Sequence, residues 1–290
     1  MSVMENLSHR AKVLIEALPY IRRYHGKTMV IKYGGSAMES EDLKRAVISD
    51  IVLLHYVGIR PIVVHGGGAE ISQMMSQLGM KAEFVNGLRV TDTETMRVTE
   101  MVLGQIGKEI VNLIHQQGGR AVGLSGKDGR LLIARKMETD SGVDLGWVGD
   151  IETVNPEILK VLESHDFIPV ISSVGVGQDG QTYNLNADHA AGKVAAATQA
   201  CKLIMLTDVR GVYRNIKDEA SLISVLTARD ARTMIDRGEA AQGMIPKLQA
   251  CLDALAGGVE RAHIIDGRLP HAVLMEIFTD EGIGTMVLND

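Results

Sequence analysis

The feature that most constrains this chain is a short apolar run followed by a glycine turn and a helix-like stretch. Residues 28–33 (TMVIKY) lead into Gly34-Gly35 and a helix-like stretch at 41–58, and residues 59–65 (IRPIVVH) lead into the triplet 66–68 (GGG). Further strand-like runs, separated by helix-like segments, lie at residues 120–125, 167–175, 202–209, 263–265 and 284–288. This alternation predicts βαβ units, and therefore an α/β fold with a mainly parallel sheet that has helices on both faces.

Two local signals add detail to this framework. The alternation of strand-like and helix-like segments is interrupted at residues 126–154. There the Asp128-Gly129 turn signal between short strand candidates predicts an inserted hairpin. Thr91 and Glu94 have the spacing of a capping box, which predicts the start of a long helix that ends at Gly118-Gly119. We place a boundary between two lobes near residue 180.

Composition excludes several classes of protein. A chain of 290 residues has room for about two domains or one large α/β unit. Its 30 basic and 36 acidic residues, and its few aromatic residues, argue against a nucleic-acid partner. Because no export signal and no membrane-spanning apolar stretch stands out, we expect a cytoplasmic protein. Cys201 and Cys251 are most simply buried apolar groups.

The two glycine turns favour anion binding over a merely tight turn. In a parallel sheet the carboxyl ends of the strands line one edge, where ligands bind. Glycine lets the backbone approach a phosphate, and helix N-terminal N–H groups then hold its charge. Residues 175–180 also match the dinucleotide pattern G-x-G-x-x-G, but a polar stretch follows where a helix should begin, which makes that match weak.

Two lysines and three alternating polar residues stand out. Lys32 lies inside an apolar strand, where it is costly to bury unless it meets an anion; the alternative is an edge lysine that reaches water. Lys247 stands at a predicted helix start, where a solvent-facing lysine is the simplest interpretation. Asn184, Asn186 and Asp188 would share one face of an extended strand, although Asp188 has the alternative of capping the following alanine-rich helix.

Other candidates are weaker. Arg89 suits a bidentate clamp on a carboxylate, and its alternative is a surface arginine. His65 ends its strand, which indicates a structural residue. Since the chain contains neither G-x-S-x-G nor H-E-x-x-H, we expect no serine nucleophile of that type and no metal site of the protein's own.

In this order, the motifs resemble the amino-acid kinase family, and within it the arginine-inhibited members that phosphorylate N-acetyl-L-glutamate. The matching stretches are VIKYGGSAM, IVVHGGGAEI, FVNGLRVTD, YNLNADHAAGKVAAA, LIMLTDVRGVY, QGMIPKLQACLDAL and the C-terminal EIFTDEGIGTMV. The resemblance implies a three-layer αβα sandwich around a mainly parallel sheet. Residues 26–180 would form the lobe for the amino-acid substrate, and residues 181–290 the lobe for ATP.

The resemblance also implies the reaction and its residues. ATP would phosphorylate the side-chain carboxylate of N-acetyl-L-glutamate to an acyl phosphate, in arginine biosynthesis, with Mg²⁺ bound through ATP. Lys32 and Lys247 would stabilise the migrating phosphoryl group, and Asp188 would hold both lysines. The substrate-binding positions are Gly67, Gly68, Arg89, Asn184 and Asn186. The ATP-binding positions are Lys32, Gly35, Thr207, Asp208, Gly243, Met244 and Lys247. Some relatives have a lysine where this chain has Phe84, so that role is not carried over.

The N-terminal segment carries a separate prediction. Residues 3–18 place apolar side chains at helical spacing, and Pro19 predicts the end or a kink of that helix. The alternative is a helix packed on its own subunit. The resemblance implies that residues 1–25 are an interaction helix that joins dimers into a hexamer, and that L-arginine is a feedback inhibitor. The candidate lining of the arginine site is Tyr20, Lys217, His271, Glu276, Gly282 and Gly284.

Three rival functions remain open at this point. The chain could be another kinase of this family, acting on glutamate, carbamate or a nucleotide. It could be a nicotinamide-dependent oxidoreductase that uses residues 175–180, or an arginine sensor without catalysis. The NGLRVTD and NLNADHA stretches favour N-acetyl-L-glutamate as the acceptor, and a sensor would not need Lys32, Asp188 and Lys247 together.

Overall fold

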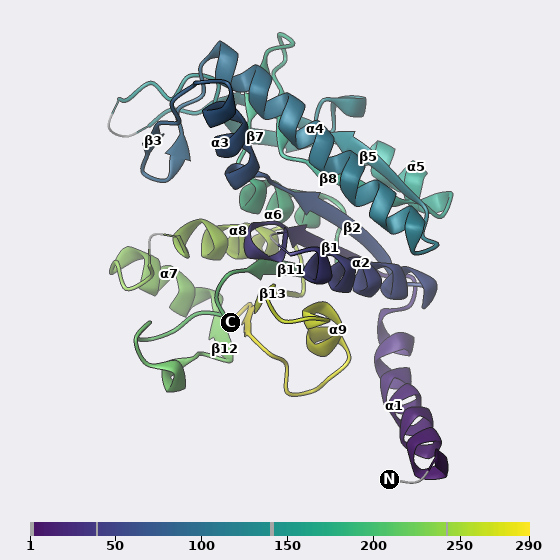
Figure 1. Cartoon of the computed structure of the whole chain (residues 1–290). Helices are drawn as coiled ribbons and strands as arrows, with labels where there is room; N and C mark the ends of the chain where they lie inside the picture. Colours follow the sequence, from purple (N-terminus) through teal and green to yellow (C-terminus); the bar gives the residue numbers. More distant parts are fainter. Residues whose placement is uncertain (1–2, 39, 140–141, 242) are drawn as a thin grey trace.

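A central eight-stranded sheet organises the molecule, whose computed structural model describes residues 3–38, 40–139, 142–241 and 243–290 (Figure 1). Its strands are β1 (Thr28–Tyr33), β2 (Arg60–His65), β5 (Ala121–Ser125), β8 (Ile168–Ser172), β11 (Lys202–Thr207), β12 (Val225–Thr227), β13 (Arg261–Asp266) and β14 (Thr285–Leu288). They lie in the order β12-β14-β13-β11-β1-β2-β8-β5, and only the β13–β14 pair is antiparallel. The predicted, mainly parallel sheet is therefore confirmed.

Helices cover both faces of this sheet. The α-helices of the described chain are α1 (Val3–Tyr24), which projects from the body, α2 (Glu41–Tyr56), α3 (Gly68–Gln77), α4 (Thr93–Gln116), α5 (Glu157–Ser164), α6 (Ala187–Ala197), α7 (Ala228–Asp236), α8 (Ile245–Ala256) and α9 (Ala272–Ile277). Alternate residues of β1 enter two separate cores: Val30 packs with residues of α6 and α8, whereas Met29 and Ile31 pack with residues of α2, α4 and α9. This two-sided burial makes the three-layer αβα sandwich, as predicted, and explains why β1 is apolar on both faces.

A smaller four-stranded sheet stands beside the central one. It contains β6 (Leu132–Lys136), β7 (Gly149–Val154), β9 (Val174–Val176) and β10 (Thr182–Asn184), in the order β10-β9-β6-β7. The predicted hairpin at 126–154 is confirmed as the antiparallel pair β6–β7. The run 167–175 is not one strand, however: it breaks at Ser173, because β9 leaves the central sheet to pair with β10. A short hairpin, β3 (Phe84–Val85) and β4 (Leu88–Arg89), completes the strands of the described chain.

One local prediction was wrong, and another was wrong in part. Asp92, not Thr91, caps α4, since its side chain accepts a hydrogen bond from the Thr95 N–H at 2.8 Å, whereas the Thr91 hydroxyl donates to the Arg89 carbonyl. Of the two outcomes predicted at Pro19, the end of the helix is wrong, because α1 continues to Tyr24, and the kink stays a prediction. Contacts beyond the proline hold this last turn: Tyr24 is buried and belongs to the core on the α2 face of the sheet.

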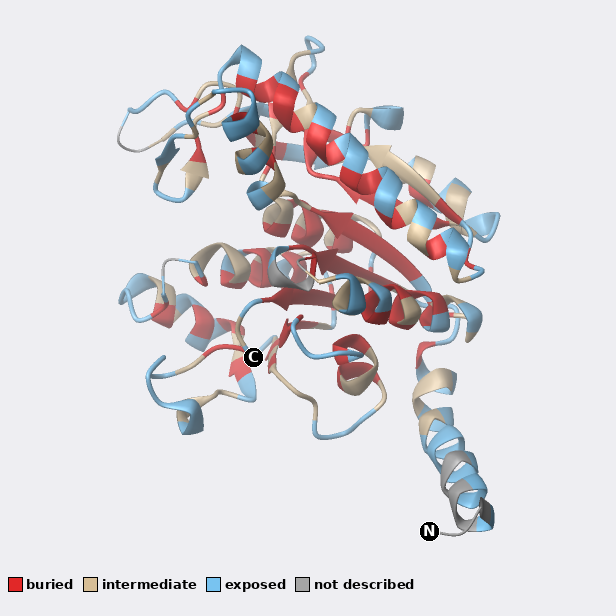
Figure 2. Cartoon of the chain, viewed as in Figure 1, coloured by how far each residue is buried: buried red, intermediate tan, exposed pale blue. Residues whose placement is uncertain are grey.

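The helix α1 projects from the body of the molecule and is coloured as exposed over most of its length (Figure 2). Leu7, Leu14 and Leu18 of the predicted stripe are 52%, 74% and 50% exposed. Residues 1–2 and the side chain of Val3 lie outside the described part of the chain. The described part of the stripe therefore does not pack on its own subunit. No helix among the described residues is both long enough and apolar enough to span a membrane.

Candidate active site

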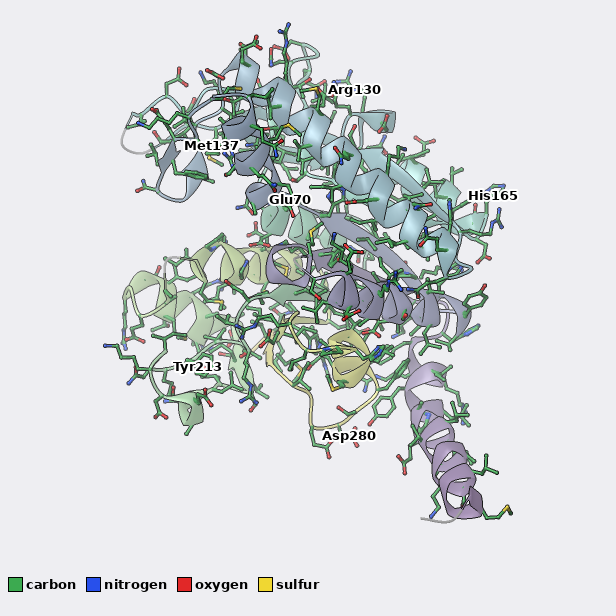
Figure 3. The ribbon with its side chains drawn as sticks, in the orientation of Figure 1. Glu70, Arg130, Met137, His165, Tyr213 and Asp280 are labelled. Atoms are coloured by element: carbon green, nitrogen blue, oxygen red, sulfur yellow. The ribbon has the colours of Figure 1, made fainter. Side chains whose placement is uncertain are left out.

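The two glycine turns meet at one edge of the central sheet. The strands β1 and β2 are parallel and pair Tyr33 with His65, so the turns that follow them lie side by side. The second turn leads directly into α3, and Gly67 is the residue that caps this helix. Figure 3 shows the neighbourhood of this turn by its label on Glu70, which lies in the first turn of α3. The predicted convergence of strand ends and a helix N-terminus is therefore present.

Three charged side chains converge beside the glycine turns. Asp188 of α6 lies between Lys32 of β1 and Lys247 of α8, with Nζ–Oδ distances of 3.0 Å and 2.7 Å. Lys32 and Asp188 are both buried. Lys32 is thus not an edge lysine, and Lys247 is not simply a solvent-facing lysine, because each ammonium group is paired with the same carboxylate. The two lysines against one carboxylate leave a net positive charge, which suits an anionic ligand.

Close packing of α6 against α8 and β1 brings these residues together. A side chain at Gly192 of α6 would place its Cβ 2.6 Å from the carbonyl oxygen of Ala250 in α8, so glycine permits this approach. Asn186 caps α6, with its side-chain oxygen accepting hydrogen bonds from the Asp188 and His189 N–H groups. The prediction that Asp188 shares an extended strand with the two asparagines was therefore wrong: Asp188 lies in the first turn of a helix, and it is not the cap.

The environment of Asp188 determines its charge. Burial alone would raise the pKa of this carboxyl, but Lys32 and Lys247 lower it to about 2. Asp188 is consequently ionised at neutral pH and holds both ammonium groups by charge-assisted contacts. The arrangement leaves the carboxylate unsuited to proton transfer near pH 7 and suited to orienting the two lysines.

A pocket of about 180 Å³ opens beside this cluster. Its lining contains all five predicted substrate-binding residues, which are Gly67, Gly68, Arg89, Asn184 and Asn186. It also contains residues that the sequence did not single out as substrate-binding, among them Phe84, Leu103, Val148 and Ser173. Ser173 carried a signal that was overlooked: it is the polar residue at which the strand-like run 167–175 breaks.

Arg89 is held firmly in this pocket. Its Nη2 donates to the Gly68 carbonyl at 2.8 Å and to the Ser72 hydroxyl at 2.7 Å, and its guanidinium lies 4.7 Å from the centre of the Phe84 ring. The side chain is buried, so the alternative of a surface arginine is wrong. Burial lowers the pKa of Arg89, yet a guanidinium stays protonated in proteins. Asn184, in turn, donates through Nδ2 to the Thr91 hydroxyl at 3.1 Å.

The remaining nucleotide candidates lie near strand ends and one helix start. Gly35 follows β1, and Thr207 ends β11, where its hydroxyl accepts a hydrogen bond from the Val209 N–H and donates to Asp208. Gly243 and Met244 directly precede α8, the helix that carries Lys247. Their role in ATP binding stays a prediction. Among the described residues, no group of three or more His, Cys, Asp or Glu side chains is placed to hold a metal ion.

The candidate arginine residues separate into two groups. A second pocket of about 160 Å³ is lined by Tyr20, Glu276, Gly282 and Gly284, together with residues that sequence reasoning missed, notably Lys202 and His263. Figure 3 labels Asp280 on this side of the molecule, and the same pocket contains residues from the C-terminal end of α1. His271 and Lys217 are not in this lining: the His271 ring contacts the buried Asp50, and Lys217 lies in an exposed loop.

The motif at 175–180 has a structure that does not fit a dinucleotide fingerprint. Its first glycines lie in and just after β9, and its last precedes β10, so the motif forms the turn of an antiparallel hairpin. A fingerprint of this kind must open a helix, whose N-terminus holds the pyrophosphate. The match is therefore incidental, as its sequence context indicated.

Comparison with known proteins agrees with this geometry. A model of the amino acid kinase family matches residues 27–266, most of the chain, and the chain belongs to this family of phosphotransferases. It is therefore an enzyme. Its relatives include the acetylglutamate kinase of Thermoanaerobacter pseudethanolicus, which is 57% identical over 279 residues, 96% of this chain and 93% of the relative. The resemblance to the amino-acid kinase family found in the sequence is thus confirmed.

Two solved structures of N-acetylglutamate synthase from Neisseria gonorrhoeae are also similar. The complex with coenzyme A and N-acetyl-glutamate has a TM-score of 0.85 and 28% identity, and the match covers 97% of this chain and 63% of that one. The complex with coenzyme A and L-arginine has a TM-score of 0.80 and 27% identity, covering 96% of this chain and 65% of that one.

Proposed function

We propose that the chain is a cytoplasmic acetylglutamate kinase of arginine biosynthesis, which transfers the γ-phosphoryl group of ATP to the side-chain carboxylate of N-acetyl-L-glutamate. The observation that carries this proposal is the Lys32–Asp188–Lys247 cluster beside a pocket. Arg89, Asn184 and the glycines at 66–68 line this pocket. The identity to relatives named acetylglutamate kinase supports the choice of acceptor.

The reaction needs positioning and positive charge more than it needs a nucleophile of the protein. A carboxylate oxygen of the acceptor attacks the γ-phosphorus, and the bond to the β–γ bridging oxygen breaks, which gives an acyl phosphate and ADP. The attacking carboxylate is already ionised at pH 7, so no general base is required. Lys32 and Lys247 face the charge that develops on the transferring oxygens, and the glycine N–H groups add neutral donors. Mg²⁺ bound to the ATP phosphates would neutralise part of their charge.

Arg89 orients the acceptor in this scheme. Its hydrogen bonds to Gly68 and Ser72 fix the guanidinium while leaving other N–H donors of the fork for a substrate carboxylate. N-acetyl-L-glutamate carries two carboxylates, and a clamp on the α-carboxylate leaves the side-chain carboxylate free to react. Carbamate has no second carboxylate, and this difference disfavours it as the acceptor.

A coupled assay of ADP release tests the proposal. N-acetyl-L-glutamate, glutamate and carbamate are supplied in turn with MgATP, and we expect turnover with the first to exceed that with the others by at least a hundredfold. Comparable turnover with glutamate or carbamate would overturn the choice of acceptor. No ADP release with any of the three would overturn the phosphotransfer.

We also propose that L-arginine inhibits the enzyme at the pocket that contains Tyr20 and Glu276. Its charged lining has both signs: Lys202, Arg23 and Arg261 suit the carboxylate of arginine, and Glu276, Asp280 and Glu281 suit its ammonium and guanidinium groups. Lys202 Nζ lies 2.7 Å from His263 Nε2, and His263 Nδ1 lies 2.5 Å from a Glu276 carboxylate oxygen. The structure of a relative that contains L-arginine supports this ligand.

The exposed stripe of α1 supports a homo-oligomer in which this helix meets a second copy of itself. An apolar helical face that is left in water is best buried against a two-fold partner. We propose that α1 pairs join dimers into a hexamer. This hexamer would have two arrangements of α1 and the pocket, and arginine would inhibit by binding one of them more tightly than the other. Light scattering of the full chain and of a chain without residues 1–25, combined with arginine titration, tests this. A truncated protein that remains hexameric would overturn the linking role of α1.

A further inference from the structure

A buried histidine lies directly beneath the glycine turn of the candidate substrate pocket. His65 is the last residue of β2 and has no exposed surface. Its Nδ1 lies 3.1 Å from the carbonyl oxygen of Gly66. Because a carbonyl can only accept, Nδ1 carries the proton and donates, and Nε2 is the bare nitrogen. Among the described residues Nε2 finds no hydrogen-bond donor.

The ring keeps this state over a wide range of pH. Burial lowers the pKa of His65 to about 4, since the charged ring would be cut off from water. At neutral pH the imidazole is therefore neutral. Its hydrogen bond to Gly66 does not change with ordinary changes of pH, and it adds no charge beside Lys32 and Lys247.

The hydrogen bond of His65 determines where one backbone donor points. A peptide unit is planar and trans, so the Gly66 carbonyl and the Gly67 N–H point in opposite directions. When His65 holds that carbonyl toward the protein interior, the N–H of Gly67 is directed to the other side, where Gly66, Gly67 and Gly68 line the pocket. Without this bond the unit between two glycines would rotate easily, because neither residue has a side chain to restrict it.

One helix supports both the ring and the turn. A side chain at Gly107 of α4 would place its Cβ 3.1 Å from His65 Nε2, so the ring rests against the backbone of this helix. The preceding residue of the same helix, Ile106, lies so close that a Cβ at Gly67 would come within 2.4 Å of its Cδ1. The ring and the glycine turn thus both lie against neighbouring residues of α4.

We propose that His65 is a positioning residue of the phosphoryl transfer, which aims the Gly67 N–H at an oxygen that gains negative charge in the transition state. The proposal rests on the proposed function, because it assigns the pocket to the reacting groups. His65 does not touch the substrate in this scheme. It acts through the peptide of Gly66 and Gly67, so its removal leaves the donor present but badly aimed.

The test compares two substitutions at His65. His65→Leu removes the donor, whereas the side-chain amide of His65→Asn can place an N–H close to the position of Nδ1. We expect His65→Leu to lower kcat about 10- to 100-fold, somewhat less than the full loss of such a donor, with the KM for ATP changed by less than about threefold. His65→Asn should recover most of the loss. Equal losses in the two variants, or an unchanged kcat in His65→Leu, would overturn the proposal.

A second pair of variants serves if His65→Leu does not fold. Gly107→Ala presses on the ring, while Gly104→Ala, three residues earlier in α4, meets no atom within 4 Å and is the matched control. We expect kcat to fall several-fold in Gly107→Ala and to stay unchanged in Gly104→Ala; the same kcat in both would contradict the role of His65. The wild type separates the two claims: an inactive wild type overturns the proposed function and this inference with it, and an active wild type with unaffected variants overturns this inference alone.

Discussion

Replacing Asp188 by Asn tests the charge cluster on which the account depends. The pKa of Asp188 is about 2 instead of 3.8, because both lysines outweigh the effect of burial. At 1.36 kcal/mol per pKa unit, the folded protein prefers the carboxylate over an uncharged group by about 2–3 kcal/mol. Asp188→Asn introduces such an uncharged group of nearly the same shape. Its free energy of unfolding should therefore be lower by about 2–3 kcal/mol at pH 7.

The pH dependence of this difference follows from the sign of the shift. A carboxyl whose pKa is lowered on folding stabilises the protein above its unfolded pKa, about 3.9, and loses that effect as the pH falls toward about 2. The difference between wild type and Asp188→Asn should be constant from about pH 5 to about pH 8 and shrink below about pH 4. Urea unfolding followed by circular dichroism measures it, and steady-state kinetics should show a large fall in kcat.

Asp50→Asn is the matched control, because it makes the same chemical change at another buried aspartate. Burial raises the pKa of Asp50 even though His271 lies 2.7 Å away. The folded protein thus accepts an uncharged group there more readily, and we expect unfolding free energy and kcat close to those of the wild type. If Asp188→Asn proved as stable and as active as Asp50→Asn, the reasoning about the cluster would be refuted.

Four further results are expected. Lys32→Ala and Lys247→Ala should each remain folded by circular dichroism but lose about 3–4 kcal/mol of transition-state stabilisation, which is measured as a fall in kcat. Near-normal turnover would contradict the role of the lysines. Arg89→Ala should raise the KM for N-acetyl-L-glutamate far more than that for ATP; equal changes in both would show that Arg89 does not bind the acceptor. Deletion of residues 1–25 should give a smaller, active enzyme that arginine inhibits weakly, and unchanged inhibition would remove α1 from the regulation. The pKa of Lys202 is lowered to about 8, so wild type should gain stability relative to Lys202→Met between pH 8 and pH 10, and a constant difference in thermal unfolding would contradict that shift.

Much of the framework follows from the sequence because it depends on local patterns. The apolar runs at 28–33 and 59–65 are strands, and each ends at the glycines that the site uses. Arg89 was singled out because a guanidinium suits a carboxylate, whereas the substrate-binding roles of Asn184 and Asn186 came from the resemblance. The pairing of Lys32 and Lys247 with Asp188 came from resemblance, since the close packing of α6 and α8 that creates it has no local signal.

The predictions that were wrong concern competition between local and tertiary effects. Asp92 and Thr91 are both residue types that cap helices well. Which of them becomes the N-cap of α4 depends on the path of the chain between β4 and α4. The run 167–175 is apolar except at Ser172, Ser173 and the final glycine, and although Ser173 marks the break, nothing local shows that β9 will pair with β10. Pro19 is tolerated in α1 because buried Tyr24 anchors the turn beyond it. His65 shows the same limit: its residue type indicates a structural role, and only the contacts with Gly66 and Gly107 indicate what it positions.

Trapping the product with hydroxylamine shows directly whether the side-chain carboxylate accepts the phosphoryl group. An acyl phosphate at the side-chain carboxylate of N-acetyl-L-glutamate reacts with hydroxylamine to give a hydroxamate, which is quantified by its iron complex and located by mass spectrometry. We expect one side-chain hydroxamate for each ADP released, with both falling together in Lys32→Ala. Release of ADP without hydroxamate would mean that water, not the carboxylate, accepts the phosphoryl group, and would contradict the account.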